Sequence, residues 1–288
     1  MKITSLTDPN RIREFLLTDR FFADYAQGDL DPAHFQFTQW FGAEEDERLR
    51  ALVMLYHDLT PPIFFATGEA RGIDLLLDRV IQHPRLSLSI REEHLPVIEK
   101  FYRTAPVPML KMALLPEEFR ATDQTSLRGG RRTTQQSPLA KNEIASRSAL
   151  AMTRLNVSHM PLLEELYSHG GGDAFRQRSL EQGVFYGLFE SERLVSVAGT
   201  HIVSGSERIA ALGNVMTHPN YRGQGLATIA TSAVCKELLD RGIEMIGLSV
   251  SRSNDAAVRV YEKIGFKRHV PFYEGTAVRK DDHEFAKE

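Results

Sequence analysis

A short glycine-rich segment carries the residues of this chain that are best suited to chemistry. The run Arg222-Gly223-Gln224-Gly225-Leu226-Ala227 combines a permanent cation with two glycines. Glycine has no Cβ and tolerates positive φ, so the backbone N–H groups can approach a ligand closely. Phosphate oxygens suit such a loop where a helix begins, because the first helical amides lack intrahelical acceptors and carry the positive end of the macrodipole. The segment predicts a pyrophosphate site.

Two regular elements must position this loop. Residues 209–216 form a mostly apolar run of strand type, which ends before Pro219. Apolar residues from Leu226 to Leu239 recur at helical spacing, and Gly242 follows where that helix would end. A plain strand-to-helix connection is the alternative explanation of the glycines. The loop lacks the Lys-Ser/Thr ending of a P-loop and the spacing of a dinucleotide-binding fingerprint, which excludes these two phosphate sites.

A second motif follows a buried strand at residues 245–250. Asn254 and Tyr261 are about two helical turns apart, so they share one helix face with Ala257. Asn254 is a good N-cap, and Gly265 followed by Phe266 is a good C-terminal stop. Capping is therefore the alternative to a ligand-binding role for Asn254, and both roles are compatible.

The two motifs in this order, R-x-x-G-x-A and then N-x-x-A-x-x-x-Y-x-x-x-G-F, resemble the GNAT superfamily of acyl-CoA-dependent N-acyltransferases. The resemblance covers residues 155–278, and the two-domain layout is similar to glycine N-acyltransferase-like proteins. It implies an α/β (α+β) fold with a mixed, mostly antiparallel central sheet flanked by helices. It also implies acetyl-CoA or another acyl-CoA as co-substrate, held by Val215, Met216, Thr217, Arg222, Gly223, Gln224, Gly225, Leu226, Ala227, Asn254, Ala257 and Tyr261.

Thioester aminolysis needs a neutral amine, a polarised carbonyl and a proton for the leaving thiolate. The resemblance places the thioester beside the end of the strand, where a free backbone N–H such as that of Met216 polarises the carbonyl. Tyr261 is the candidate general acid, since a phenol of pKa about 10 can donate to a thiolate whose thiol pKa is about 8.5. Core packing is the alternative role for Tyr261.

The general base is less well defined by the sequence. Many relatives carry a carboxylate on the strand before the phosphate loop, whereas this strand has Glu207 only at its start and Asn214 near its end. His201, on the preceding strand-like run, is a candidate base that faces the same groove. A structural histidine is the alternative, and a water chain through Asn214 would serve equally.

The chain is expected to divide into two domains joined by a polar segment. Residues 1–120 form an α/β domain, 121–149 a linker or exposed loop with an RGGRR run, and 150–288 the GNAT-like catalytic domain. The strand and helix order of residues 52–114 repeats that of the C-terminal domain, which suggests a degenerate copy of the fold. Its equivalent loop carries Glu69 and lacks the second glycine spacing, so we expect it to bind no CoA. A glycine-rich loop at residues 167–175 is a candidate lid over the acceptor, or a flexible connector.

Composition limits the alternatives. A net charge of −3 argues against general nucleic-acid binding, because no basic surplus is present. The single cysteine, Cys235, excludes an intrachain disulfide and a cysteine metal site, and the histidines show no ligand spacing, so no metal is expected. The charged start is unlike a signal peptide and no stretch reaches transmembrane length, which predicts a cytoplasmic protein without membrane contact. The sequence leaves open whether the chain forms a homodimer.

Two hypotheses for function follow. The first is an enzyme that transfers an acyl group, most simply acetyl, from CoA to a primary amine of a small molecule or amino acid by direct attack in a ternary complex. The second is a catalytically silent CoA-binding regulatory or scaffold protein, which the missing mid-strand carboxylate would explain. The sequence leaves the acceptor and the acyl length open.

Overall fold

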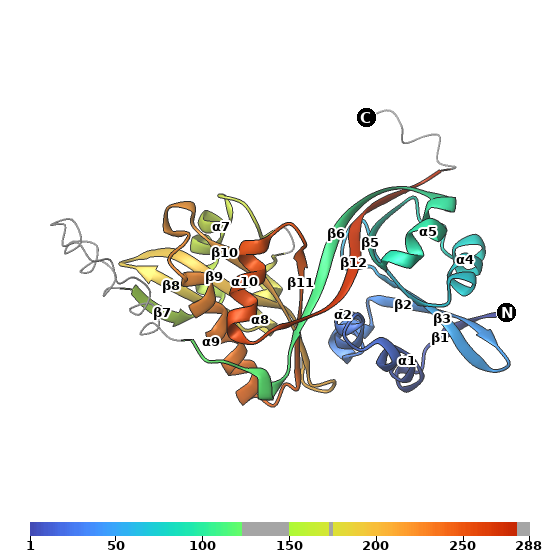
Figure 1. Cartoon of the computed structure of the whole chain (residues 1–288), viewed down its shortest axis with the longest axis horizontal. Helices are drawn as coiled ribbons and strands as arrows, with labels where there is room; N and C mark the ends of the chain where they lie inside the picture. Colours follow the sequence, from blue (N-terminus) through green and yellow to red (C-terminus); the bar gives the residue numbers. More distant parts are fainter. Residues whose placement is uncertain (123–149, 173–174, 281–288) are drawn as a thin grey trace. The chain divides into compact units, whose positions relative to one another are not determined.

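The computed structural model describes residues 1–122, 150–172 and 175–280 (Figure 1). Helices and mostly antiparallel strands alternate along the chain, as the sequence predicted, and the predicted linker lies outside the described residues apart from residues 121 and 122. None of the helices in these ranges has the length and apolar character needed to span a lipid bilayer.

The elements follow one another in two series of similar order. The first series is β1 (Lys2–Leu6), α1 (Pro9–Leu16), α2 (Asp24–Gly28), α3 (Pro32–Phe35), β2 (Thr38–Glu45), β3 (Arg48–Tyr56), β4 (Ile63–Gly68), α4 (Ala70–Arg79), β5 (Arg85–Arg91), α5 (Leu95–Phe101) and β6 (Tyr102–Leu114). The second is β7 (Leu150–Arg154), α7 (Met160–Tyr167), α8 (Gln177–Gln182), β8 (Tyr186–Glu190), β9 (Arg193–Ser204), β10 (Ile209–Thr217), α9 (Leu226–Asp240), β11 (Met245–Ser251), α10 (Asp255–Ile264) and β12 (Lys267–Arg279).

Contacts divide the chain into two compact units. Unit 1 contains Met1–Met112, Ser249–Asn254 and the chain from Arg268 onward, and unit 2 contains Ala113–Leu248 and Asp255–Lys267. The division of the chain into contiguous domains at residues 1–120 and 150–288 stays a prediction. Most of strand β12 belongs to unit 1, because residues 272–278 pair antiparallel with residues 85–91 of β5.

Unit 1 is a sheet with helices packed on both faces. Its strands follow the order β1-β2-β3-β4-β5-β12-β6, and the parallel strands β4 and β5 are connected by α4. Successive side chains of a strand point to opposite faces. Accordingly Val53 and Leu55 of β3 join the core formed with α4 and α5, whereas Leu52 and Met54 join the core formed with α1 and α2.

Unit 2 repeats this plan. Its strands follow the order β11-β10-β9-β8-β7, and the parallel strands β10 and β11 are connected by α9. Leu163 and Leu166 of α7 pack with Val197 of β9 and Met216 of β10 in one buried cluster. The equivalent position of a parallel pair and its connecting helix in both units confirms the predicted tandem arrangement.

Candidate functional site

Strand β10 carries a β-bulge just before the glycine-rich loop. Gly213 pairs with Gly199 of β9, but the next pair is Met216 with Val197, so β10 contains one extra residue between the two pairs. Asn214 lies in this bulge with a φ of 55°, a left-handed conformation in which asparagine is among the more tolerant residues. The bulge therefore breaks the regular ladder where the sequence analysis expected the thioester.

The same part of β10 has an open edge. Its pairing with β11 ends at Ala211 and Gly247, although β10 continues to Thr217. His218 N–H donates to Val195 O of β9. Because successive N–H groups of a strand point to alternate sides, the N–H groups of Thr217 and Val215 point away from β9. The alternation turns Met216 N–H toward β9. Val215 N–H is thus better placed than Met216 N–H to reach a ligand at the open edge.

The loop between β10 and α9 has the backbone geometry of an anion site. Gly223 and Gly225 have φ values of 75° and 78°, and a Cβ at Gly223 would meet open space. No side chain caps the N-terminus of α9, and the first hydrogen bond of the helix runs from Ile229 N–H to Gly225 O. The amides that precede Ile229 are therefore available to phosphate oxygens. Arg222 is exposed beside them, and its Nε lies 3.2 Å from Thr217 O.

Two pairs of side chains hold the start of this loop. His218 is buried, and its Nδ1 accepts from Asn220 N–H at 3.3 Å at the beginning of the short helix Pro219–Tyr221. Arg193 Nη2 lies 2.8 Å from His218 Nε2, and Tyr221 Oη donates to Glu190. Burial and the neighbouring Arg193 charge lower the pKa of His218, so this imidazole is neutral and works as a structural anchor.

Tyr261 lies on the buried face of α10, which packs on α9. Its side chain is 8% exposed, and its ring contacts Phe266 edge to face at a centroid distance of 5.8 Å. Burial, with a smaller effect from Cys235, raises the pKa of Tyr261 to about 12, so the phenol keeps its proton. Ala257 is half-buried on the same helix, and Asn254 is exposed immediately before it, where a cap would stand. Cys235 is buried, and burial raises the pKa of its thiol, which fits packing better than nucleophilic chemistry.

His201 and Asn214, the two residues considered for the general base, lie next to each other. Asn214 Nδ2 lies 3.5 Å from His201 Nδ1 and 3.5 Å from Thr200 O. The imidazole also covers Gly213, since a Cβ at that glycine would stand 1.9 Å from His201 Nε2. Gly213 therefore makes room for His201 against β10.

Tyr167, at the end of α7, entered the sequence prediction only as the first residue of the candidate lid, and its contact with β10 was not foreseen. Its hydroxyl donates to Asn214 O at 2.8 Å, directly at the bulge. The three glycines that follow it were the available signal in the sequence, because they mark an unusual loop at this position. Residues 173 and 174 of the predicted lid lie outside the described residues.

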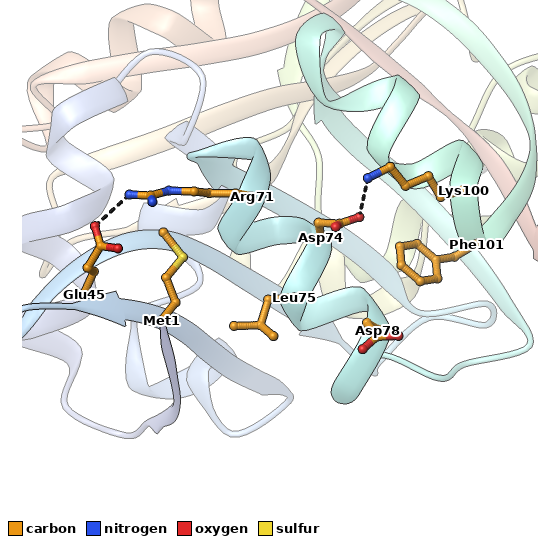
Figure 2. A pocket seen from close by; sticks show the side chains of 8 residues that line it. All are labelled: Met1, Glu45, Arg71, Asp74, Leu75, Asp78, Lys100 and Phe101. Atoms are coloured by element: carbon orange, nitrogen blue, oxygen red, sulfur yellow. Dashed lines mark hydrogen bonds and ion pairs between the residues drawn. The ribbon is translucent and has the colours of Figure 1, made fainter.

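Unit 1 keeps the helix that follows the fourth strand but not the loop before it. Only Glu69 separates β4 from α4, whereas residues 218–225 separate β10 from α9. The cation that the sequence retains, Arg71, donates to Glu69 Oε2 at 2.8 Å and to Glu45 Oε2 at 2.7 Å, as Figure 2 shows for Glu45. The pocket beside it also contains the ion pair of Asp74 and Lys100 at 2.8 Å (Figure 2). These carboxylates neutralise the cations that would attract a phosphate. Across the described residues of both units, no group of three or more acidic, histidine or cysteine side chains is arranged to hold a metal ion.

Fold and site together define a mixed α/β protein with two units of one plan, of which unit 2 has the bulged strand, glycine loop and uncapped helix. Residues 152–266 match the model of the Acetyltransferase (GNAT) family. This part of the chain is a GNAT acetyltransferase domain, which confirms the resemblance of the two motifs.

Curated relatives match short parts of the chain. An acetyltransferase of Sodalis glossinidius is 42% identical over 50 residues, 17% of this chain and 35% of that protein. The [Ribosomal protein bS18]-alanine N-acetyltransferase of Escherichia coli is 30% identical over 92 residues, 32% of this chain and 60% of that protein. The chain thus spans about a third of the length of the first of these relatives.

Solved structures resemble most of the chain in fold. A Drosophila protein has a TM-score of 0.69 at 11% identity, with 96% of this chain and 98% of that chain covered. A tandem GNAT protein from the clavulanic acid biosynthesis pathway has a TM-score of 0.53 at 12% identity, with 96% and 98% covered. A GCN5-related N-acetyltransferase from Kribbella flavida has a TM-score of 0.57 at 13% identity, with 92% and 96% covered.

Proposed function

We propose that this protein transfers an acetyl group from acetyl-CoA to a primary amine of a small molecule or amino acid, by direct attack in a ternary complex on unit 2. The observation that carries the proposal is the succession of a bulged strand with an open edge, a loop with two left-handed glycines and an uncapped helix. The family match of residues 152–266 supports the same reaction.

The residues present fit the co-substrate. The amides before Ile229 and the exposed Arg222 offer donors and positive charge to the pyrophosphate, and the open space at Gly223 leaves room for it. Bound acetyl-CoA supplies the thioester as acyl donor. The open edge of β10 presents Val215 N–H and Thr217 N–H along the path from the loop to the bulge.

Three groups of the chain then act as carbonyl-polarising donor, general acid and general base. Val215 N–H stabilises the charge that gathers on the carbonyl oxygen as the amine attacks. Tyr261, which holds its proton, donates to the departing thiolate sulfur. His201, or water ordered between it and Asn214, takes the proton from the attacking nitrogen.

The acceptor is assigned only by class. The Escherichia coli relative is named for acetylation of an alanine of a ribosomal protein, which makes an amino-terminal amine a reasonable member of the acceptor panel. The alternative, a CoA-binding protein without catalysis, is favoured by one observation: β10 has Asn214 and no carboxylate at the bulge.

The test is release of free thiol from acetyl-CoA across a panel of primary amines, amino acids and amino-terminal peptides, together with calorimetric CoA titration. We expect CoA binding and thiol release that depends on one class of amine. Binding without amine-dependent release across the panel would support the silent CoA-binding protein, and the absence of CoA binding would contradict both functions.

A matched pair of variants tests the cradle. Gly223→Val and Gly242→Val both place a side chain at a left-handed φ with no atom within 4 Å, but Gly242 follows the far end of α9. We expect Gly223→Val to weaken CoA binding by roughly tenfold or more and Gly242→Val to leave it unchanged. Equal effects of the two substitutions would refute the cradle.

A further inference from the structure

The contact between Tyr167 and the bulge joins two elements that are distant in the sequence. Tyr167 ends α7 and donates its hydroxyl hydrogen to the carbonyl oxygen of Asn214, 2.8 Å away. Burial raises the pKa of Tyr167, so the phenol stays neutral and keeps the hydrogen that it donates. The bulge carbonyl thus has a fixed partner on the side of α7.

The geometry of a peptide bond extends this contact to a second atom. The C=O of Asn214 and the N–H of Val215 belong to one planar, trans peptide unit, so they point in opposite directions. A donor that holds the carbonyl toward α7 also turns Val215 N–H away from α7. A hydrogen bond to the carbonyl further polarises the N–H of the same unit.

The loop after Tyr167 holds its ring in place. Gly172 has a φ of 75°, and a Cβ on it would stand 2.6 Å from the Tyr167 ring, so only glycine allows the loop to fold over the phenol. A Cβ on Gly171 would stand 3.8 Å from the Met216 sulfur, and the His169 ring lies edge to face on His218 at a centroid distance of 4.4 Å. The loop therefore contacts β10 and the residue that anchors the phosphate loop.

We propose that Tyr167 is a positioning residue, which fixes the Asn214–Val215 peptide so that Val215 N–H points at the carbonyl oxygen of the bound acyl group. This inference rests on the proposed function, because it needs a thioester at the open edge of β10. It adds α7 and its loop to the machinery: they do not touch the reacting atoms, but they aim the donor that does.

The first test is Tyr167→Phe, which removes the hydroxyl and keeps the ring. We expect kcat to fall by roughly 10-fold to 100-fold while the KM for acetyl-CoA stays within about twofold, because the donor is misaligned and the phosphate loop is intact. The matched control is Tyr186→Phe, another partly buried tyrosine of unit 2, whose hydroxyl interacts with Glu237. An unchanged kcat in Tyr167→Phe, with an active wild type, would overturn the inference and leave the proposed function intact.

A binding measurement does not depend on knowing the acceptor. We expect Tyr167→Phe to weaken binding of S-acetonyl-CoA, a stable ketone with the carbonyl near its place in the thioester, by roughly fivefold or more. Plain CoA, which has no such carbonyl, should bind equally to wild type and variant. Equal loss for both ligands, or loss for neither, would overturn the positioning role. Failure of the wild type to bind either ligand would refute the proposed function itself.

A second pair of variants covers the case in which Tyr167→Phe does not fold. Gly172→Ala keeps the hydroxyl but pushes on the Tyr167 ring, whereas Gly170→Ala imposes a similar positive-φ strain with no atom within 4 Å of its Cβ. We expect the selective loss of S-acetonyl-CoA binding in Gly172→Ala and wild-type selectivity in Gly170→Ala. The same selectivity in both variants would contradict the inference.

Discussion

Lys111 Nζ lies 2.6 Å from Asp24 Oδ1 in unit 1, and both side chains are 2% exposed. The ammonium group also stands 3.9 Å from the centroid of the Tyr25 ring, so one cation serves a carboxylate and an aromatic face. The second oxygen of Asp24 is buried without a hydrogen-bond partner among the described residues. A buried pair of this kind is costly to break, because removal of one partner leaves an uncompensated charge.

Replacing this lysine should therefore destabilise the protein strongly. We expect Lys111→Met to lower the free energy of unfolding by about 3–5 kcal/mol, measured by urea denaturation. The control is Lys100→Met, which removes the lysine of an exposed pair with Asp74 and should cost less than about 1 kcal/mol. A similar loss in the two variants would show that the buried pair is not the cause.

Asp29, which is buried near Asp24 and Lys111, should also make the free energy of unfolding depend on pH. Burial, with the negative charge of Asp24, raises the pKa of Asp29 from 3.8 to about 8. Below pH 3.8 both folded and unfolded states hold the proton, and between about pH 4 and 8 only the folded state does. The free energy of unfolding should therefore fall as pH rises through this window, by up to about 1.4 kcal/mol per pH unit, and level off above pH 8. Urea midpoints from pH 5 to 9 measure this, and Asp29→Asn should flatten the slope.

Tyr261→Phe tests the proposed general acid. The variant keeps the buried ring but removes the proton donor, so we expect kcat to fall by roughly 10²-fold with little change in CoA affinity. Because the pKa of Tyr261 is about 12, the wild-type rate should show no loss from phenol ionisation below about pH 11. Turnover equal to wild type would remove Tyr261 from the mechanism and leave its packing against Phe266 as its role.

His201→Ala tests the candidate base through its pH profile. A base matters most where the acceptor amine is largely protonated, so the rate should fall more at neutral than at alkaline pH. Loss of the ring also uncovers Gly213, so thermal denaturation should accompany the kinetics to separate folding from catalysis. A variant with the pH profile of wild type would exclude His201 as the base.

Local features of the site could be predicted from the sequence because each depends on a few neighbouring residues. The strand at 209–216, the left-handed glycines and the helix that begins at Leu226 follow from apolar spacing and from the missing Cβ of Gly223 and Gly225. The helix over residues 255–264 follows from its apolar spacing and from the stop at Gly265. The GNAT fold of both units is confirmed, whereas the assignment of individual site residues stays a prediction.

Long-range pairings could not be predicted in this way. The bulge at Asn214 depends on how β10 pairs with β9, and the Tyr167 contact spans 47 residues, so neither leaves a periodic pattern. In unit 1, the element order expected from the sequence began at residue 52, so β1 and β2 were missed. Tertiary packing decides these features and local propensity does not.

The pairing of β12 with β5 has a consequence for biosynthesis. Unit 1 receives its last strand from residues near the carboxyl end, so a nascent chain that has emerged only to residue 120 exposes the unpaired edge of β5. That edge stays open until translation has passed Arg279. A fragment cut at the predicted boundary would keep the edge permanently, and chaperone capture or aggregation of the truncated product is the expected fate.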